Sequence, residues 1–272
     1  MSLLIIAGLT LLLLAWIAGE PWLVERRRDR LRARPFPAAW RRIIARRVPH
    51  FRRLPADLQL QLKKHMLVFL AEKPFIGCRG VVVTDEMRVT IAAQACLLIL
   101  NRRTGYFPGL RQVLVYPEAF VVDRVQADGF GVTQERRHAL SGESWSQGQV
   151  ILSWDDTLAG ACVVDDGRNV VIHEFAHQLD QETGHANGAP RLGRRERYAR
   201  WSQVLGGEYE ALVQRTLAGQ PTLLSDYGAT DPAEFFAVAS EVFFEQPQRL
   251  AAEHPALYGE LAGFYRVDPG SW

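Results

Sequence analysis

The sequence predicts an α+β protein in which a single N-terminal transmembrane helix precedes one large folded region. Three observations carry this prediction. An uncharged apolar run occupies residues 2–19, helical patterns alternate with short β-branched runs in the middle of the chain, and two histidines lie four residues apart at positions 173 and 177. The 272 residues are enough for a sizeable hydrophobic core behind the N-terminal run.

The apolar run has the length of a membrane span. Residues 2–19 contain no charged side chain, and residues 22–24 extend the run past Glu20. At about 1.5 Å per helical residue, such a segment covers a hydrocarbon core of roughly 30 Å. A cleaved signal peptide would need a basic start and a small-x-small cleavage site, and the sequence has neither. We therefore expect a transmembrane anchor at residues 1–24.

A basic juxtamembrane segment follows at residues 25–50. Its stretch 26–47 carries ten arginines and one aspartate, whereas the whole chain has a net charge of only +2, so the remainder is net acidic. Positive flanks stay in the cytoplasm. We therefore expect a single-pass protein of a bacterial-type inner membrane, with its folded part cytoplasmic and its arginines near lipid head groups. No nucleic-acid motif accompanies the arginines, so we expect no nucleic-acid partner.

Beyond this segment we expect an N-terminal α/β lobe over residues 51–135 and a second lobe over residues 136–272. Helical patterns and β-branched runs supply the elements. The expected helices are 55–72 and 85–103, and the expected strands are 81–83, 113–116, 120–122 and 149–154. The last strand is either internal or an edge that pairs with an extended peptide, and the sequence leaves both open. Three cysteines without a C-x-x-C pair fit a reducing compartment.

A His-Glu-Phe-Ala-His stretch begins at His173 and forms an H-E-x-x-H motif. Apolar residues at helical spacing, with turn residues 165–167 before them and Gly184 after them, predict a helix here. On a helix, His173 and His177 lie one turn apart on one face and can bind a zinc ion from the same side. Glu174 then lies where it can take a proton from zinc-bound water. The alternative is a helix with two ordinary histidines and a surface glutamate.

A zinc site of this type needs a third protein ligand. Asp231 and Pro232 predict the start of an apolar helix that carries two acids, Glu234 and Glu241, seven residues apart on one face. An acid on an apolar face is costly unless it is paired or binds a metal. Glu234 also fits a capping box with Asp231. The pattern alone leaves either acid, or neither, as the ligand.

The chain resembles the zinc peptidase family of Mlc titration factor A from about residue 35 to the C-terminus. The similar segments are VLVYPEAFVV (113–122), SGESW (141–145), VILSW (150–154), HEFAHQLD (173–180), ANGAP (186–190) and DPAEFFAVASEVFF (231–244). The resemblance implies a zincin-like catalytic domain with one Zn²⁺ per chain. It also implies that His173, His177 and Glu234 are the metal ligands.

Tyr227 lies seven residues before Glu234, as a tyrosine does in the related catalytic domain of anthrax lethal factor. The resemblance implies that its phenol donates to the oxyanion of a tetrahedral intermediate. The alternative is an ordinary half-buried tyrosine. In the family, a histidine that can reach the metal precedes the SGxSW segment, but the matching position here is Thr133, and His138 is close without being aligned. We therefore expect an open site that admits water.

Several residues near the motif keep open roles. Asp180 is either an acceptor for a ligating histidine or a cap of the helix end, and Glu241 and His138 are candidates for similar supporting contacts. A longer histidine signature would need a histidine at position 183, which is Thr183. His185 is therefore expected to be a loop residue.

Together, these expectations describe a membrane-anchored zinc metallopeptidase that hydrolyses peptide bonds, with Glu174 as general base and Tyr227 as oxyanion donor. Its partners would be a peptide or protein substrate, the membrane through residues 1–24, and a regulatory protein. The alternative is a non-catalytic regulatory protein that uses the same fold to bind a transcriptional repressor or another partner, because the resembling family is named for such binding.

Overall fold

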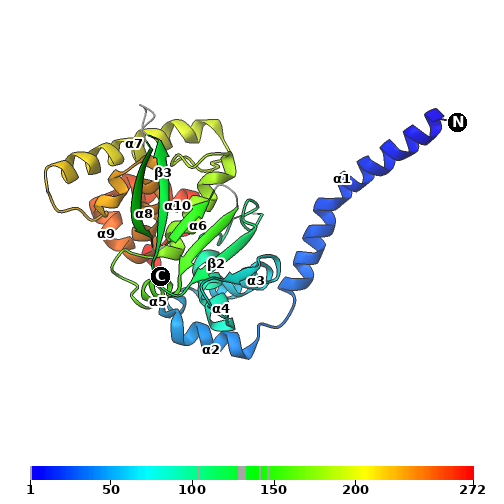
Figure 1. Cartoon of the computed structure of the whole chain (residues 1–272), viewed down its shortest axis with the longest axis horizontal. Coiled ribbons are helices and arrows are strands. Elements are labelled where there is room, and N and C mark those ends of the chain that lie inside the picture. Colours follow the sequence, from blue (N-terminus) through cyan, green and yellow to red (C-terminus); the bar gives the residue numbers. More distant parts are fainter. Residues whose placement is uncertain (1, 103–104, 128–132, 141, 146–147) are drawn as a thin grey trace.

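The computed structural model describes residues 2–102, 105–127, 133–140, 142–145 and 148–272, with side chains except those of residues 2–9, 11–15, 17–18 and 120–147. Figure 1 shows a helix-rich body from which the N-terminal helix projects. The α+β prediction is confirmed as a helix-rich protein with a small mixed sheet and a separate two-stranded hairpin.

The projecting helix α1 (Ser2–Arg32) is 31 residues long and contains Pro21. Most of the side chains on which the anchor prediction rests lie outside the described residues. Among the side chains that are described, no helical segment combines the length and the apolarity that crossing a bilayer requires. The anchor at residues 1–24 stays a prediction. The last turns of α1 dock onto the body, where Leu31 is buried.

Three helices and a 3-10 turn follow, namely α2 (Ala38–Arg47), η1 (Pro49–Arg52), α3 (Ala56–Glu72) and α4 (Asp85–Leu97). Thr84 caps α4, because its side chain accepts a hydrogen bond from the N–H of Met87 at 3.3 Å. The helix predicted over 85–103 is therefore present but shorter. It ends at Leu97 because Leu98 and the two residues after it donate to carbonyls three residues back, which tightens the chain into turns.

The central sheet consists of β1 (Phe75–Gly77), β2 (Gln112–Tyr116), β6 (Gln149–Ser153) and β5 (Gly142–Trp145), in that spatial order. The first three strands are parallel, and β5 pairs antiparallel with β6 at the edge. In β2 only the alternate residues Val113 and Val115 are buried, whereas β6 is buried from Val150 to Ser153, as expected for a strand covered on both faces. The hairpin of β3 (Phe120–Ala127) and β4 (Thr133–Leu140) forms a second, two-stranded antiparallel sheet.

The predicted strand over residues 81–83 is wrong. The chain turns there, since the N–H of Val81 donates to the carbonyl of Cys78, and Val82 is 81% exposed. The strand that pairs with β2 is β1 instead. Residues 149–153 form the internal strand β6, and the two edge strands of this sheet are β1 and β5 among the strands that are described.

The second half of the chain is mainly helical. Its elements are α5 (Trp154–Cys162), α6 (Val170–Asp180), η2 (Gln181–Thr183), α7 (Arg195–Leu217), η3 (Asp226–Ala229), α8 (Pro232–Glu245), α9 (Pro247–Glu253), α10 (Pro255–Tyr265) and η4 (Pro269–Ser271). Proline at the first helical position starts α8, α9 and α10, where its missing N–H costs nothing. Helix α6 contacts β5 and β6 as well as α8.

One continuous hydrophobic core joins the two halves. The ring of Phe175 on α6 lies 4.8 Å from that of Phe107 and 5.7 Å from that of Phe69, centroid to centroid. Such contacts resist rotation of α6 about its axis, because any rotation would open a void in a close-packed interior. The lobe boundary expected between residues 135 and 136 falls in β4, whose side chains are not described, and it stays a prediction.

Candidate metal centre

Helix α6 presents two histidines on one face. Asn169 caps this helix, because its Oδ1 accepts a hydrogen bond from the N–H of Ile172 at 3.0 Å, and residues 165–167 form the bend before it. His173 and His177 follow one turn apart. Their Nε2 atoms are 3.2 Å apart and their ring centroids 4.9 Å apart, so the two imidazoles converge on one point.

Helix α8 brings Glu234 to these histidines. Asp231 caps α8, with its Oδ1 accepting from the N–H groups of Ala233 and Glu234 at 2.8 and 3.0 Å. Glu234 Oε2 lies 2.9 Å from His173 Nε2 and 3.4 Å from His177 Nε2. The carboxylate therefore faces α6 instead of returning to the cap, as it would in a capping box.

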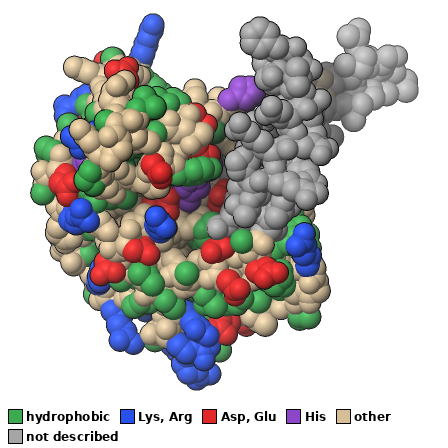
Figure 2. Space-filling view, turned by 60° about the vertical axis from the view of Figure 1, so that its left-hand side comes forward, with side chains coloured by type: hydrophobic (Ala, Val, Ile, Leu, Met, Phe, Trp, Pro, Cys, Tyr) green, Lys and Arg blue, Asp and Glu red, His purple; other side chains and the backbone are tan. Residues whose placement is uncertain are grey.

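The three side chains form a donor set that fits a metal ion. One atom each from His173, His177 and Glu234 lies within 4.8 Å of the others. Two imidazoles and a carboxylate are a zinc-binding set that leaves one position for water or substrate. Figure 2 shows histidine and acidic side chains together in a hollow of the described surface. The residues present thus suit Zn²⁺.

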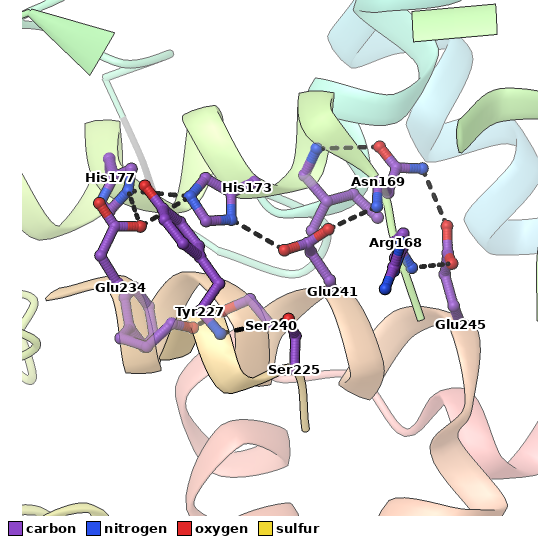
Figure 3. Close-up of polar contacts among 12 residues, drawn as sticks. Arg168, Asn169, His173, His177, Ser225, Tyr227, Glu234, Ser240, Glu241 and Glu245 are labelled. Carbon is purple, nitrogen blue, oxygen red and sulfur yellow. Dashed lines mark hydrogen bonds and ion pairs between the residues drawn. The ribbon is translucent and has the colours of Figure 1, made fainter. Parts of the chain in front are cut away.

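Glu241 supports His173 from behind the donor set. Its Oε1 lies 2.8 Å from His173 Nδ1, and its Oε2 accepts from the N–H of Asn169 (Figure 3). Since Nδ1 is directed at Glu241, the nitrogen that faces Glu234 and His177 is Nε2, which is the atom available to bind a metal once it has lost its proton. The two acids that sequence alone did not distinguish therefore contact opposite nitrogens of the same imidazole.

Burial and neighbouring charges have opposite effects on the pKa values of His173 and Glu234. Burial alone would lower the pKa of His173, but the carboxylates of Glu241 and Glu234 outweigh it and raise the pKa of the imidazole well above its usual value. Burial alone would raise the pKa of Glu234, but hydrogen bonds from His173 and His177 hold that pKa far below its usual range. In the metal-free protein His173 and Glu234 form an ion pair, so metal binding must displace a proton.

A further buried carboxylate, Glu245, lies one turn beyond Glu241 on α8. Its oxygens accept from the side-chain amide of Asn169 and from the N–H of Arg168, both at 3.0 Å. Burial raises the pKa of Glu245 to about 9 despite the hydrogen bond from Asn169, so this carboxyl is protonated at neutral pH. Sequence reasoning missed Asn169 and Glu245. The available signal was an asparagine directly before an apolar helix.

The predicted base and the predicted oxyanion donor both lie at this centre. Glu174 follows His173 on α6 and is only 4% exposed, and its charge contributes to raising the pKa of the His173 imidazole. Tyr227 comes from η3 and is 48% exposed, with its ring centroid 5.9 Å from that of His173. Figure 3 shows its phenol pointing toward His177 and Glu234.

Other residues singled out from the sequence lie away from the donor set. Asp180 binds the loop that follows α6, since its Oδ2 accepts from the N–H groups of Asn187 and Gly188. His185 lies exposed in that loop, as expected. The side chains of Thr133 and His138 fall outside the described residues, and their roles stay predictions.

Comparison with known proteins agrees with this geometry. The family described as glucose-regulated metallo-peptidase M90 matches residues 22–266. An uncharacterized protein of Synechocystis sp. is 41% identical over 264 residues, which cover 96% of each chain. Mlc titration factor A of Klebsiella pneumoniae is 35% identical over 233 residues (85% of this chain and 86% of the relative), and that of Salmonella typhi is 36% identical over 225 residues (82% and 84%). The chain therefore belongs to the glucose-regulated metallo-peptidase M90 family.

Proposed function

We propose that this protein is a zinc-dependent metallopeptidase with a zincin-like catalytic domain. One observation carries the proposal. Two helices from distant parts of the chain bring ligand atoms of His173, His177 and Glu234 within 4.8 Å of one another, in a metallopeptidase family. In this proposal these three residues bind one Zn²⁺ per chain. The acceptor that Glu241 offers to His173 supports the assignment, because metal-bound histidines commonly donate their other N–H to a carboxylate.

The remaining side chains of the site supply proton transfer and charge stabilisation. A bound zinc ion would contribute Lewis acidity toward water and the peptide carbonyl. Glu174 takes the proton of the attacking water and delivers it to the leaving amine. Tyr227 donates a hydrogen bond to the carbonyl oxygen as negative charge develops there. Its place beside His173 supports that role.

The substrate class that fits the fold is an extended peptide or protein segment. Strand β5 lies at the end of the sheet, antiparallel to β6, and packs against α6. An edge strand offers backbone N–H and C=O groups to which a peptide can add as a further strand. A peptide bound to β5 would lie beside the helix that carries both histidines.

We also propose that α1 anchors the protein in a bacterial-type inner membrane as a single pass, with the catalytic domain in the cytoplasm. The uncharged run at residues 2–19 and the arginines that follow it support this orientation. A match that covers 96% of this chain must include part of residues 2–32, so the Synechocystis relative is similar in sequence to at least some of that segment.

A second candidate function is binding of a regulatory protein without catalysis. The observation in its favour is the name Mlc titration factor A, which several relatives carry and which describes an action on Mlc. The same fold can serve both functions, since a surface used for a partner need not include the metal centre.

Glu174→Gln separates the two functions. The substitution removes the base but no ligand, so zinc content should stay at one per chain while peptide turnover falls about 10²–10⁴-fold. Tyr227→Phe, which loses only the hydroxyl, should also keep zinc and lower turnover by about 10²–10³-fold. Metal analysis and hydrolysis of a peptide library measure both quantities.

Turnover by Glu174→Gln close to that of the wild type would rule out the assigned mechanism. The regulatory function would be favoured by two results together. The zinc-loaded wild type would hydrolyse no peptide, and Glu174→Gln would leave binding of the partner protein unchanged.

A further inference from the structure

We propose that Asp180 and Gly188 form a clamp that sets the spacing of the two ligand-bearing helices, and so positions His177 and Glu234 for the metal. The inference rests on the proposed function only in calling these two residues ligands. Asp180 is the last residue of α6, three residues after His177, and is fully buried. Its Oδ2 accepts from the N–H groups of Asn187 and Gly188, each at 2.7 Å, so the loop is fastened to the end of α6.

The same loop packs closely against the first residue of α8, through Gly188 and Pro232. Gly188 has φ +75°, in the left-handed region that favours glycine. A Cβ at this position would come within 2.9 Å of the carbonyl carbon of Pro232, and nearer still to its oxygen. Pro232 is the first residue of α8 and lies two residues before Glu234. Only a residue without a side chain lets the loop approach the helix this closely.

A third contact fixes the loop from the side of α7. Trp201, which is 1% exposed, donates from its indole Nε1 to the carbonyl of Gly188 at 2.8 Å. Its ring lies 5.8 Å from that of Phe236 on α8 and 5.5 Å from that of Phe264 on α10. The N–H of Gly188, its carbonyl and the side of its Cα that faces Pro232 are therefore all held by different elements.

These contacts determine the distance on which the donor set depends. His177 Nε2 and Glu234 Oε2 are 3.4 Å apart. His177 lies three residues before Asp180 on α6, and Glu234 lies two residues after Pro232 on α8. Metal sites tolerate ligand displacements of only a few tenths of an ångström. A wider gap between α6 and α8 would therefore weaken metal binding before it unfolds the protein.

Gly188→Ala tests the clamp, and Gly193→Ala is its matched control. Gly193 has φ +83°, but a Cβ added there meets nothing within 4 Å, so both variants carry backbone strain and only Gly188→Ala pushes on α8. We expect Gly188→Ala to weaken zinc binding about 10–100-fold and Gly193→Ala to leave it unchanged. Competition with a chromophoric chelator measures the dissociation constants. Equal affinities of the two variants would overturn the proposal.

If Gly188→Ala does not fold, two variants at Asp180 provide a second comparison. Asp180→Asn keeps an acceptor oxygen for the loop and should retain most of the zinc affinity, whereas Asp180→Ala should lose it to a similar extent as Gly188→Ala. Equal affinities of these two variants would also contradict the clamp.

A crystal structure of the metal-free Gly188→Ala variant tests the clamp without measuring zinc binding or turnover. If that variant does not fold, Asp180→Ala is used instead. We expect the distance from His177 Nε2 to Glu234 Oε2 to exceed its value of 3.4 Å. An unchanged distance overturns the clamp. Failure of the wild type to bind zinc would reject the proposed function and leave this structural test standing.

Discussion

The imidazole of His173 is held on both of its ring nitrogens by carboxylates from one helix. Glu234 and Glu241 lie seven residues apart on α8, and the same ring receives both, at 2.9 and 2.8 Å. Hydrogen bonds to charged groups contribute about 1.5–3 kcal/mol each, and a buried charge left without its partner costs more than that. Glu234 faces Nε2 on the side of the proposed metal, whereas Glu241 faces Nδ1 on the opposite side of the ring. Substitution of the two acids should therefore affect zinc binding differently.

Removing Glu234 should abolish tight zinc binding, because Glu234→Ala deletes one of three ligands. Removing Glu241 should not. Glu241→Ala should still bind one zinc per chain at saturation, with an affinity lowered about 10–100-fold because the ring loses the acceptor that orients it. Zinc stoichiometry and chelator competition distinguish the two losses.

Glu245→Gln serves as the matched control for these variants, since it is isosteric on the same helix and contacts neither histidine. Its zinc affinity should equal that of the wild type. Full zinc in Glu234→Ala combined with loss in Glu241→Ala would reverse the assignment of ligand and supporting acid.

Glu245 itself makes stability depend on pH. Its pKa is raised to about 9 in the folded protein, whereas in the unfolded chain it lies near 4.5. Between these values the folded state keeps a proton that the unfolded state has lost, so this group lowers the stability as pH rises, by at most about 1.4 kcal/mol per pH unit. Glu245→Gln should therefore be close to wild type at pH 5 and more stable than it at pH 8. Urea unfolding at both pH values checks this, and a stability difference that does not grow with pH would contradict it.

Among the elements, those with local signals were predictable from the sequence. Asp231 and Pro232 fix the start of α8, and apolar spacing fixes α6. The run 81–83 misled because its β-branched residues favour a strand, whereas a strand also needs a partner, and the neighbour of β2 is β1. Residues 81–83 therefore do not form a strand, although their side chains favour one, because no strand among the described residues pairs with them.

The contacts that complete the site were beyond the reach of sequence patterns. The bond between His173 and Glu241 spans 68 residues, and that between Asn169 and Glu245 spans 76. Spacing placed Glu234 and Glu241 on one face of a helix, but it did not say which nitrogen of which imidazole each would meet. That information lies in the way α6 and α8 pack together.

At the scale of the whole molecule, α1 is fastened to the body by its arginines. Arg28 donates two hydrogen bonds to Glu72 at 2.8 Å each and one to the carbonyl of Gly105 at 3.1 Å, and its guanidinium lies 4.9 Å from the ring centroid of Tyr106. Arg32 donates to the hydroxyl of Tyr106 at 3.3 Å. These two arginines therefore join the helix to the domain.

The orientation proposed for α1 has a direct test. A C-terminal fusion to alkaline phosphatase should be inactive, because that reporter needs export to form its disulfides and the C-terminus is expected in the cytoplasm. A fusion to green fluorescent protein at the same position should fluoresce and serves as the control. An active phosphatase fusion would place the domain on the other side of the membrane.

Two truncations separate the anchor from the docked part of α1. Deleting residues 1–24 keeps Arg28, Leu31 and Arg32 in place, so the remaining domain should fold and bind zinc. Deleting residues 1–34 also removes the ion pair with Glu72 and the buried Leu31. A charged hydrogen-bonded contact contributes about 1.5–3 kcal/mol, so the shorter protein should melt several degrees lower, at roughly 2–4 °C per kcal/mol.

Zinc stoichiometry should be the same in both truncated proteins, since every proposed ligand lies at position 173 or beyond. Arg28→Gln in the protein that lacks residues 1–24 should reproduce part of the lower melting temperature, because it breaks the contact with Glu72 without shortening the chain. Equal melting temperatures of the two truncations would mean that the docking of α1 adds no stability. If the protein without residues 1–24 neither folds nor holds zinc, then the first turns of α1 belong to the folded domain and are more than an anchor.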